Sequence, residues 1–102
     1  MLDQQQEQAE IARTRMPHGN EQFALVKGLL GAGKISVDCE DGKHRIGRII
    51  GKIKKRVWIR DGDLVLITPW EIQSDERCDV IWKYTRTQAN YLKRTGKLKI
   101  EL

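Results

Sequence analysis

Short apolar segments separated by glycine-containing turns recur at a spacing of 8 to 12 residues between Phe23 and Thr68. In one of them Ile35, Val37 and Cys39 alternate with polar residues, which is the period of two expected of a half-buried strand. Five short strands in so short a stretch favour a closed barrel, because closure removes the exposed edges of a small sheet. The five predicted strands are 23–31, 34–40, 44–49, 56–60 and 64–68.

Glycines mark the predicted turns. Asp41 and Gly42 form a hairpin signal, since glycine adopts the positive φ of a tight primed turn without steric cost. The run from Gly31 to Gly33 predicts a loop between the first two strands. Gly47, inside the third predicted strand, indicates a bulge or a bend at a barrel corner. The strand count and turns fit an all-β chain with a five-stranded OB-fold barrel.

The two ends of the chain have a different character. Residues 1–21 are glutamine-rich without an apolar period, so we expect a flexible, disordered arm. The barrel region is expected at 22–84, and includes a strand-like segment at its end with Val80, Trp82 and Tyr84 on one side. Residues 85–102 are predicted to form a short C-terminal α-helical extension and tail, because residues 85 and 88 have capping-box spacing and a glycine at 96 can end the helix.

Composition limits the classes of protein. The 102 residues suffice for one domain, and no apolar run approaches the ~20 residues of a membrane-spanning helix. The polar N-terminus does not suit a signal peptide. Cys39 and Cys78 have no zinc-site spacing, so we expect reduced thiols in a cytoplasmic protein with no metal and no other cofactor.

Catalytic motifs are weak. Gly28 to Lys34 matches part of a phosphate-binding loop, but Ile35 replaces the required Ser or Thr, and a strand follows where a helix should begin. His18 and His44 could form a ribonuclease pair only if the arm folded back onto the barrel. We therefore predict that the protein is not an enzyme.

Positive charge is concentrated in the middle of the chain, within a net charge of +5. From Lys43 to Arg60 there are eight Lys or Arg in 18 residues and no Asp or Glu. If Val57 and Ile59 point into the barrel, strand alternation directs the intervening Trp58 outward between two arginines. An aromatic ring that stacks on bases, beside cations that neutralise phosphates, is typical of RNA-binding OB barrels. The alternative is that this ring packs under the C-terminal helix.

These residues also resemble a known family. The stretch "DGKHRIGRIIGKIKKRVWIRDGDLVLITPWE", followed by "DVIWKYT", is similar to archaeal translation initiation factor 1A, a family with eukaryotic members and a bacterial counterpart, initiation factor one. The resemblance covers about residues 22–96. It implies an OB barrel that binds small-subunit ribosomal RNA near the A site without catalysis, as a monomer in contact with other initiation factors. The RNA contacts that it implies are Arg45, Arg48, Lys52, Lys54, Lys55, Arg56, Trp58, Arg60 and Lys83.

Two other classes remain open from the sequence. A generic single-stranded RNA-binding module with the same fold would bind short oligonucleotides by itself. A protein-interaction adaptor would instead use the side that carries Val80, Trp82 and Tyr84 together with the C-terminal helix, with the basic patch serving only solubility.

Overall fold

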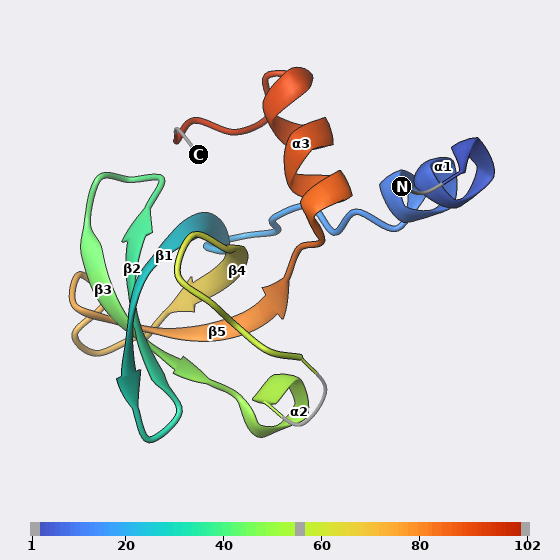
Figure 1. The fold of residues 1–102 in the computed structure, drawn as a ribbon. Helices are drawn as coiled ribbons and strands as arrows, with labels where there is room; N and C mark the ends of the chain where they lie inside the picture. Colours follow the sequence, from blue (N-terminus) through green and yellow to red (C-terminus); the bar gives the residue numbers. More distant parts are fainter. Residues whose placement is uncertain (1–2, 55–56, 101–102) are drawn as a thin grey trace.

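This computed structural model describes residues 3–54 and 57–100, which form a barrel of strands with one helix before it, one between its strands and one after it (Figure 1). The elements in chain order are α1 (Gln4–Ala12), β1 (Gln22–Gly31), β2 (Lys34–Cys39), β3 (His44–Ile49), α2 (Gly51–Lys54), β4 (Leu64–Pro69), β5 (Arg77–Lys83) and α3 (Arg86–Arg94).

The five strands close into a barrel in the order β1-β2-β3-β5-β4. All neighbours are antiparallel except β3 and β5, which run parallel. The closed five-stranded barrel, with a helix following its last strand, confirms the predicted OB fold.

The prediction of a strand at 56–60 was wrong. Residues 57–60 form no strand, and Arg56 lies outside the described residues. The place between β3 and β4 belongs to β5, so every strand of the barrel already pairs on both sides. Because a closed barrel has no free edge, the apolar residues of 57–60 have no ladder to join.

Both predicted hairpins are confirmed, whereas Gly47 has a different reason from the one expected. Gly42 has φ +85° in the β2–β3 turn, and its amide donates to the carbonyl of Cys39. The register between β2 and β3 is continuous at Gly47, so the glycine marks no bulge there. A Cβ atom at this position would lie 2.7 Å from Cγ2 of Val80. Glycine is needed because two elements approach closely inside the barrel.

A bulge in β5 breaks the alternation expected near its end. Leu66 pairs with Trp82 and Ile67 with Val80, so Ile81 is the extra residue on β5. Val80 and Tyr84 are consequently both buried, whereas Trp82 is partly exposed. The three side chains do not form the one exposed side on which the adaptor alternative depended.

Two apolar clusters hold the fold together. The first fills the barrel and includes Val26, Val37 and Val80. The second, outside it, consists of Phe23, Leu64, Leu66, Tyr84 and Leu92. Leu92 brings α3 into this second cluster, and the predicted capping box between Thr85 and Gln88 is present at its first turn. The C-terminal helix is thereby confirmed.

The N-terminal arm contains the helix α1, which the sequence did not predict. Asp3 caps the helix by accepting from the amide of Gln6 at 2.8 Å. No residue of α1 is buried, so the arm adds nothing to the apolar core, as its composition indicated. It nevertheless lies beside α3 (Figure 1).

Candidate nucleic-acid interface

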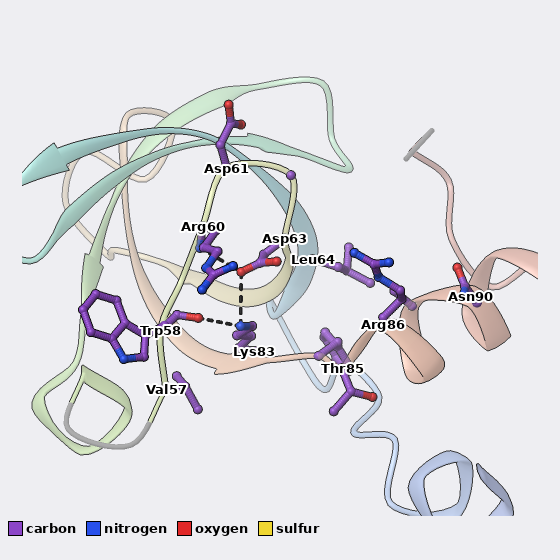
Figure 2. Close-up of a pocket in the computed structure, with 13 residues that line it drawn as sticks. Val57, Trp58, Arg60, Asp61, Asp63, Leu64, Lys83, Thr85, Arg86 and Asn90 are labelled. Atoms are coloured by element: carbon purple, nitrogen blue, oxygen red, sulfur yellow. Dashed lines mark hydrogen bonds and ion pairs between the residues drawn. The ribbon is translucent and has the colours of Figure 1, made fainter. Parts of the chain in front are cut away.

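A groove of about 960 Å³ separates the segment 57–63 from the start of α3 (Figure 2). Trp58 lies at one end and Asn90 at the other, with Lys83 of β5 between them. The lining residues are Val57, Trp58, Arg60, Asp61, Gly62, Asp63, Leu64, Lys83, Tyr84, Thr85, Arg86, Ala89 and Asn90. These residues come from two parts of the chain, 57–64 and 83–90, which only the folded barrel brings together.

Asp63 organises the floor of the groove. Its Oδ2 accepts from the backbone amide of Arg60 at 2.8 Å and lies 3.3 Å from Nζ of Lys83. The same ammonium donates to the backbone carbonyl of Trp58 (Figure 2). Gly62, at φ +91°, allows the tight turn that points Asp63 back toward the barrel. This network fixes the segment 57–63 to β5, although the segment itself forms no strand.

The side chain of Trp58 extends into solvent. Its side chain is 82% exposed, which excludes packing under the C-terminal helix. Ile59 is buried in the barrel cluster as predicted, but Val57 is 37% exposed and does not point into the core. The outward direction of Trp58 was therefore predicted correctly from an alternation that holds on only one side of it.

Arg60 and Lys83, both predicted from the sequence, line the groove together with Arg86, which sequence reasoning missed. Arg86 is the first residue of α3 and is exposed. Its position after the Thr85 cap could have indicated a cation on the first turn of the helix, but not which surface of the barrel that turn would meet.

The lysines of α2 lie close to the same segment. Lys52 and Lys54 are exposed on α2, and the amide of Val57 donates to the carbonyl of Ile53 at 3.1 Å, so a hydrogen bond joins the groove segment to this helical turn. Lys55 and Arg56 were predicted as contacts too and lie outside the described residues.

Arg48 belongs to a separate cluster. Its guanidinium lies 5.2 Å from the centre of the Trp70 ring, and its Nε is 3.1 Å from Oδ1 of Asp79. The indole N–H of Trp70 donates to the same carboxylate at 2.9 Å. These three residues border hollows that share no lining residue with the groove. Arg48 remains exposed, but its charge is partly neutralised by Asp79.

Arg45 is a correction to the predicted set. Only 4% of it is exposed, and its guanidinium donates to both oxygens of Asp41, at 3.0 and 2.8 Å, and to the carbonyl of Ser74 at 2.6 Å. The resemblance implied an RNA contact here, yet this arginine is buried and its charge is paired with Asp41. Its function in this structure is to tie the β2–β3 turn to the β4–β5 loop, so it is not available to a ligand.

The pair between Arg45 and Asp41 predicts acid sensitivity. Hydrogen bonds from Arg45 lower the pKa of Asp41 to about 2. Because the pKa of Asp41 is lower in the folded state, its stabilisation is present above the usual unfolded value of about 4 and is lost as the pH falls toward 2. With Asp41 partly exposed, we expect a loss of about 1 to 2 kcal/mol of unfolding free energy across that window. Urea denaturation at pH 5 and pH 2.5 would measure it.

The control for this prediction is Asp41→Asn. Its unfolding free energy should be lower at pH 5 and should change less between the two pH values than that of the natural chain. An equal pH dependence in both proteins would assign the acid sensitivity to other carboxylates.

Both cysteines are buried as free thiols. Burial raises the pKa of both thiols, that of Cys78 to about 12, so they remain protonated and unreactive. Within residues 3–54 and 57–100, His, Cys, Asp and Glu form no group that could hold a metal ion. In the same part of the chain no helix is long and apolar enough to cross a membrane.

Comparison with known proteins gives consistent results for sequence and fold. Residues 8–102 match the family model of translation initiation factor 1A / IF-1. Translation initiation factor 1A of Methanothermobacter thermautotrophicus is 52% identical over 91 residues, which cover 89% of this chain and 92% of that one. The factor of the same name from Pyrococcus abyssi is 51% identical over 92 residues, or 90% and 81% of the two chains.

Two solved structures are similar in fold. The solution structure of translation initiation factor one from a Wolbachia endosymbiont of Brugia malayi gives a TM-score of 0.50 at 21% identity, and the match covers 71% of this chain and 85% of that one. The crystal structure of YjeQ from Thermotoga maritima gives 0.54 at 19% identity, covering 65% and 23%. At these identities the two structures support the fold alone.

Proposed function

Because the chain belongs to the translation initiation factor 1A / IF-1 family, we propose that it binds ribosomal RNA of the small subunit near the A site through the groove of Figure 2. The observation that carries this proposal is the nearly complete exposure of Trp58 at one end of a groove lined by cations. Exposing the large apolar ring of a tryptophan to water is unfavourable, and its flat face is a surface on which an unpaired base can stack.

The groove offers two kinds of contact. Trp58 would stack on a base at one end of the groove, and Arg60 and Arg86, on opposite walls, would contact the phosphates of the strand as it continues toward Asn90. Lys83 is already engaged by Asp63, so its main effect is to hold the wall in place and only secondarily to attract the RNA backbone. The cations would draw the RNA to the groove, while the stacked ring sets its register.

The remaining predicted contacts would extend this surface. Lys52 and Lys54 of α2, with Lys55 and Arg56 after them, would contact the RNA backbone beyond Trp58. Arg48 would contribute less because Asp79 neutralises part of its charge. We do not include Arg45. We further propose that the protein acts in the cytoplasm as a monomer, together with other initiation factors, and that it catalyses no reaction.

The groove favours one alternative function over the other. A generic single-stranded RNA-binding module would use the same Trp58 and the same cations. The adaptor loses the strand side of its proposed surface, because Val80 and Tyr84 are buried, and keeps only the C-terminal helix. The choice therefore lies between a factor that recognises assembled ribosomal RNA and a module that recognises any single strand.

Cosedimentation with purified small subunits, compared with filter binding to a short oligonucleotide, would decide this choice. A ribosome factor combines backbone contacts with a fixed RNA shape, so we expect affinity for the subunit to exceed that for the oligonucleotide by ~10-fold or more. Equal affinities would favour the generic module. Binding to neither would exclude the RNA function for this groove.

A further inference from the structure

We propose that the N-terminal arm acts as a latch which holds α3 in the position that forms the groove, with Gln88 and Tyr84 as the positioning residues. This inference rests on the proposed function, because it concerns the same groove. It assigns to residues 10–16, which the core does not need, an effect on RNA affinity without contact with the RNA.

Two hydrogen bonds between distant parts of the chain define the latch. Nε2 of Gln88 donates to the backbone carbonyl of Glu10 at 2.9 Å, and the hydroxyl of Tyr84 donates to the backbone carbonyl of Arg15. Both donors belong to buried residues, with Gln88 5% and Tyr84 2% exposed. A buried donor that loses its partner costs free energy, so these bonds favour the docked arm.

The arm is also held through Arg15. Its guanidinium lies 6.0 Å from the centre of the Trp82 ring, which is a contact with the barrel, whereas its ion pair with Oε2 of Glu21, at 3.4 Å, lies within the arm. The first contact places Arg15 over the partly exposed ring of Trp82 near the end of β5. The arm therefore spans from β5 to α3 and crosses the short connection between them (Figure 1).

α3 needs such support. A helix of nine residues is marginal in water without packing, and α3 contributes a single fully buried apolar side chain, Leu92, to the second cluster. Leu92 lies in the second half of the helix, whereas the groove is formed by the first half, at Arg86, Ala89 and Asn90. The latch acts on that first half through Gln88.

The latch and the groove lie on different sides of the same helical turn. Consecutive helical residues point about 100° apart, so Gln88 can bond to the arm while Ala89 and Asn90 line the groove. Tyr84, at the β5–α3 junction, takes part in both. Releasing the arm would free this turn to shift, and Arg86 would move relative to Arg60 and Trp58.

Gln88 has two separable contacts, which makes a selective variant possible. Its Oε1 accepts from the amide of Thr85 at 3.0 Å and caps α3, whereas its Nε2 reaches the arm. Gln88→Glu keeps the acceptor, and glutamate is a good capping-box residue. The carboxylate has no N–H for the carbonyl of Glu10 and repels it, so the variant retains the helix cap and breaks the latch.

The test measures subunit RNA affinity of the full chain carrying Gln88→Glu. Loss of one such hydrogen bond corresponds to about 2- to 12-fold weaker binding, if the latched position is the binding-competent one. Thr87→Glu is the matched control, because it adds the same charge to the same turn but removes neither bond to the arm. Its affinity loss measures the charge alone, so the latch predicts a greater loss for Gln88→Glu.

Tyr84→Phe is the second variant. It retains the ring that packs against Phe23, with centroids 5.4 Å apart, and removes only the hydroxyl. If both residues act through one docked arm, the affinity losses of Gln88→Glu and Tyr84→Phe should be less than additive in the double variant. Additive losses would mean two independent local effects and would overturn the latch.

Hydrogen exchange without RNA separates failure of the latch from failure of the proposed function. Gln88→Glu should speed exchange in residues 10–16 and in the first turn of α3, while β1 to β5 keep their protection. Unchanged exchange there, or binding equal to that of Thr87→Glu, would overturn the latch. Faster exchange in a protein whose natural form does not bind subunits would instead show a latch without an RNA function.

Discussion

A fourfold increase in salt concentration is expected to weaken binding to small-subunit RNA by about 100-fold. If about five phosphates are neutralised, a slope of about −0.7 per contact gives a total near −3.5 in a double-logarithmic plot, because each neutralised phosphate releases a counterion. The expectation follows from the acid-free segment from Lys43 to Arg60 and from the cations that line the groove. Equilibrium binding at four or five salt concentrations measures the slope.

Neutralised variants test which cations contribute. Arg60→Gln combined with Arg86→Gln should make the slope shallower by about 1.4, at about 0.7 for each lost contact. Lys27→Gln is a control that removes one positive charge from an exposed position of β1 outside the groove. It should leave the slope unchanged. An affinity that does not depend on salt would contradict the RNA proposal, and a slope that changes equally in all variants would assign it to net charge alone.

Ile59→Ala and Trp58→Ala are expected to have opposite effects although the residues are adjacent. Ile59 is 7% exposed within the barrel cluster, so its truncation should cost ~2 to 5 kcal/mol of unfolding free energy and leave the affinity of the folded protein unchanged. Trp58 is 82% exposed, so its truncation should cost little stability but weaken RNA binding by ~1 to 3 kcal/mol.

Denaturation midpoints and subunit affinities for both variants test this pair. Val57→Ala is a useful third protein, because Val57 is 37% exposed and should show neither large effect. If Trp58→Ala bound as tightly as the natural chain, base stacking would be excluded and the cations alone would form the contact. A destabilised Trp58→Ala protein would mean that the ring packs on the barrel in solution.

The hairpins of this protein could be predicted from the sequence because their determinants are local. Gly42 and the glycines at 31 and 33 adopt positive φ, a conformation that favours glycine wherever the turn occurs. The capping box of α3 is equally local, since Thr85 and Gln88 contact each other within one turn. Each of these features depends on residues at most four positions apart.

The errors concern features that depend on partners elsewhere in the chain. The segment 56–60 has strand-like residues, but β5 takes the only position between β3 and β4. Arg45 looked like a surface cation until Asp41 and Ser74 enclosed it. Arg86 was missed because it joins the groove only through the position of α3 opposite the segment 57–63. The spacing of residues along the chain does not show which of several candidate segments pairs with its neighbours in a closed barrel.

The sequence by itself determined the fold class and the basic segment, because periodicity, turn residues and charge act over short distances along the chain, and its motifs carried the family resemblance. It left open whether Trp58 points outward or packs under the C-terminal helix, and the tertiary structure decided this. The tertiary structure alone decided which segment closes the barrel, which cation is buried and which cations share the groove. Those outcomes depend on long-range pairing, where burial and hydrogen bonding choose among segments of similar local preference. The docking of the arm on Gln88 and Tyr84 is of the same kind, since its two hydrogen bonds join residues that are 78 and 69 positions apart.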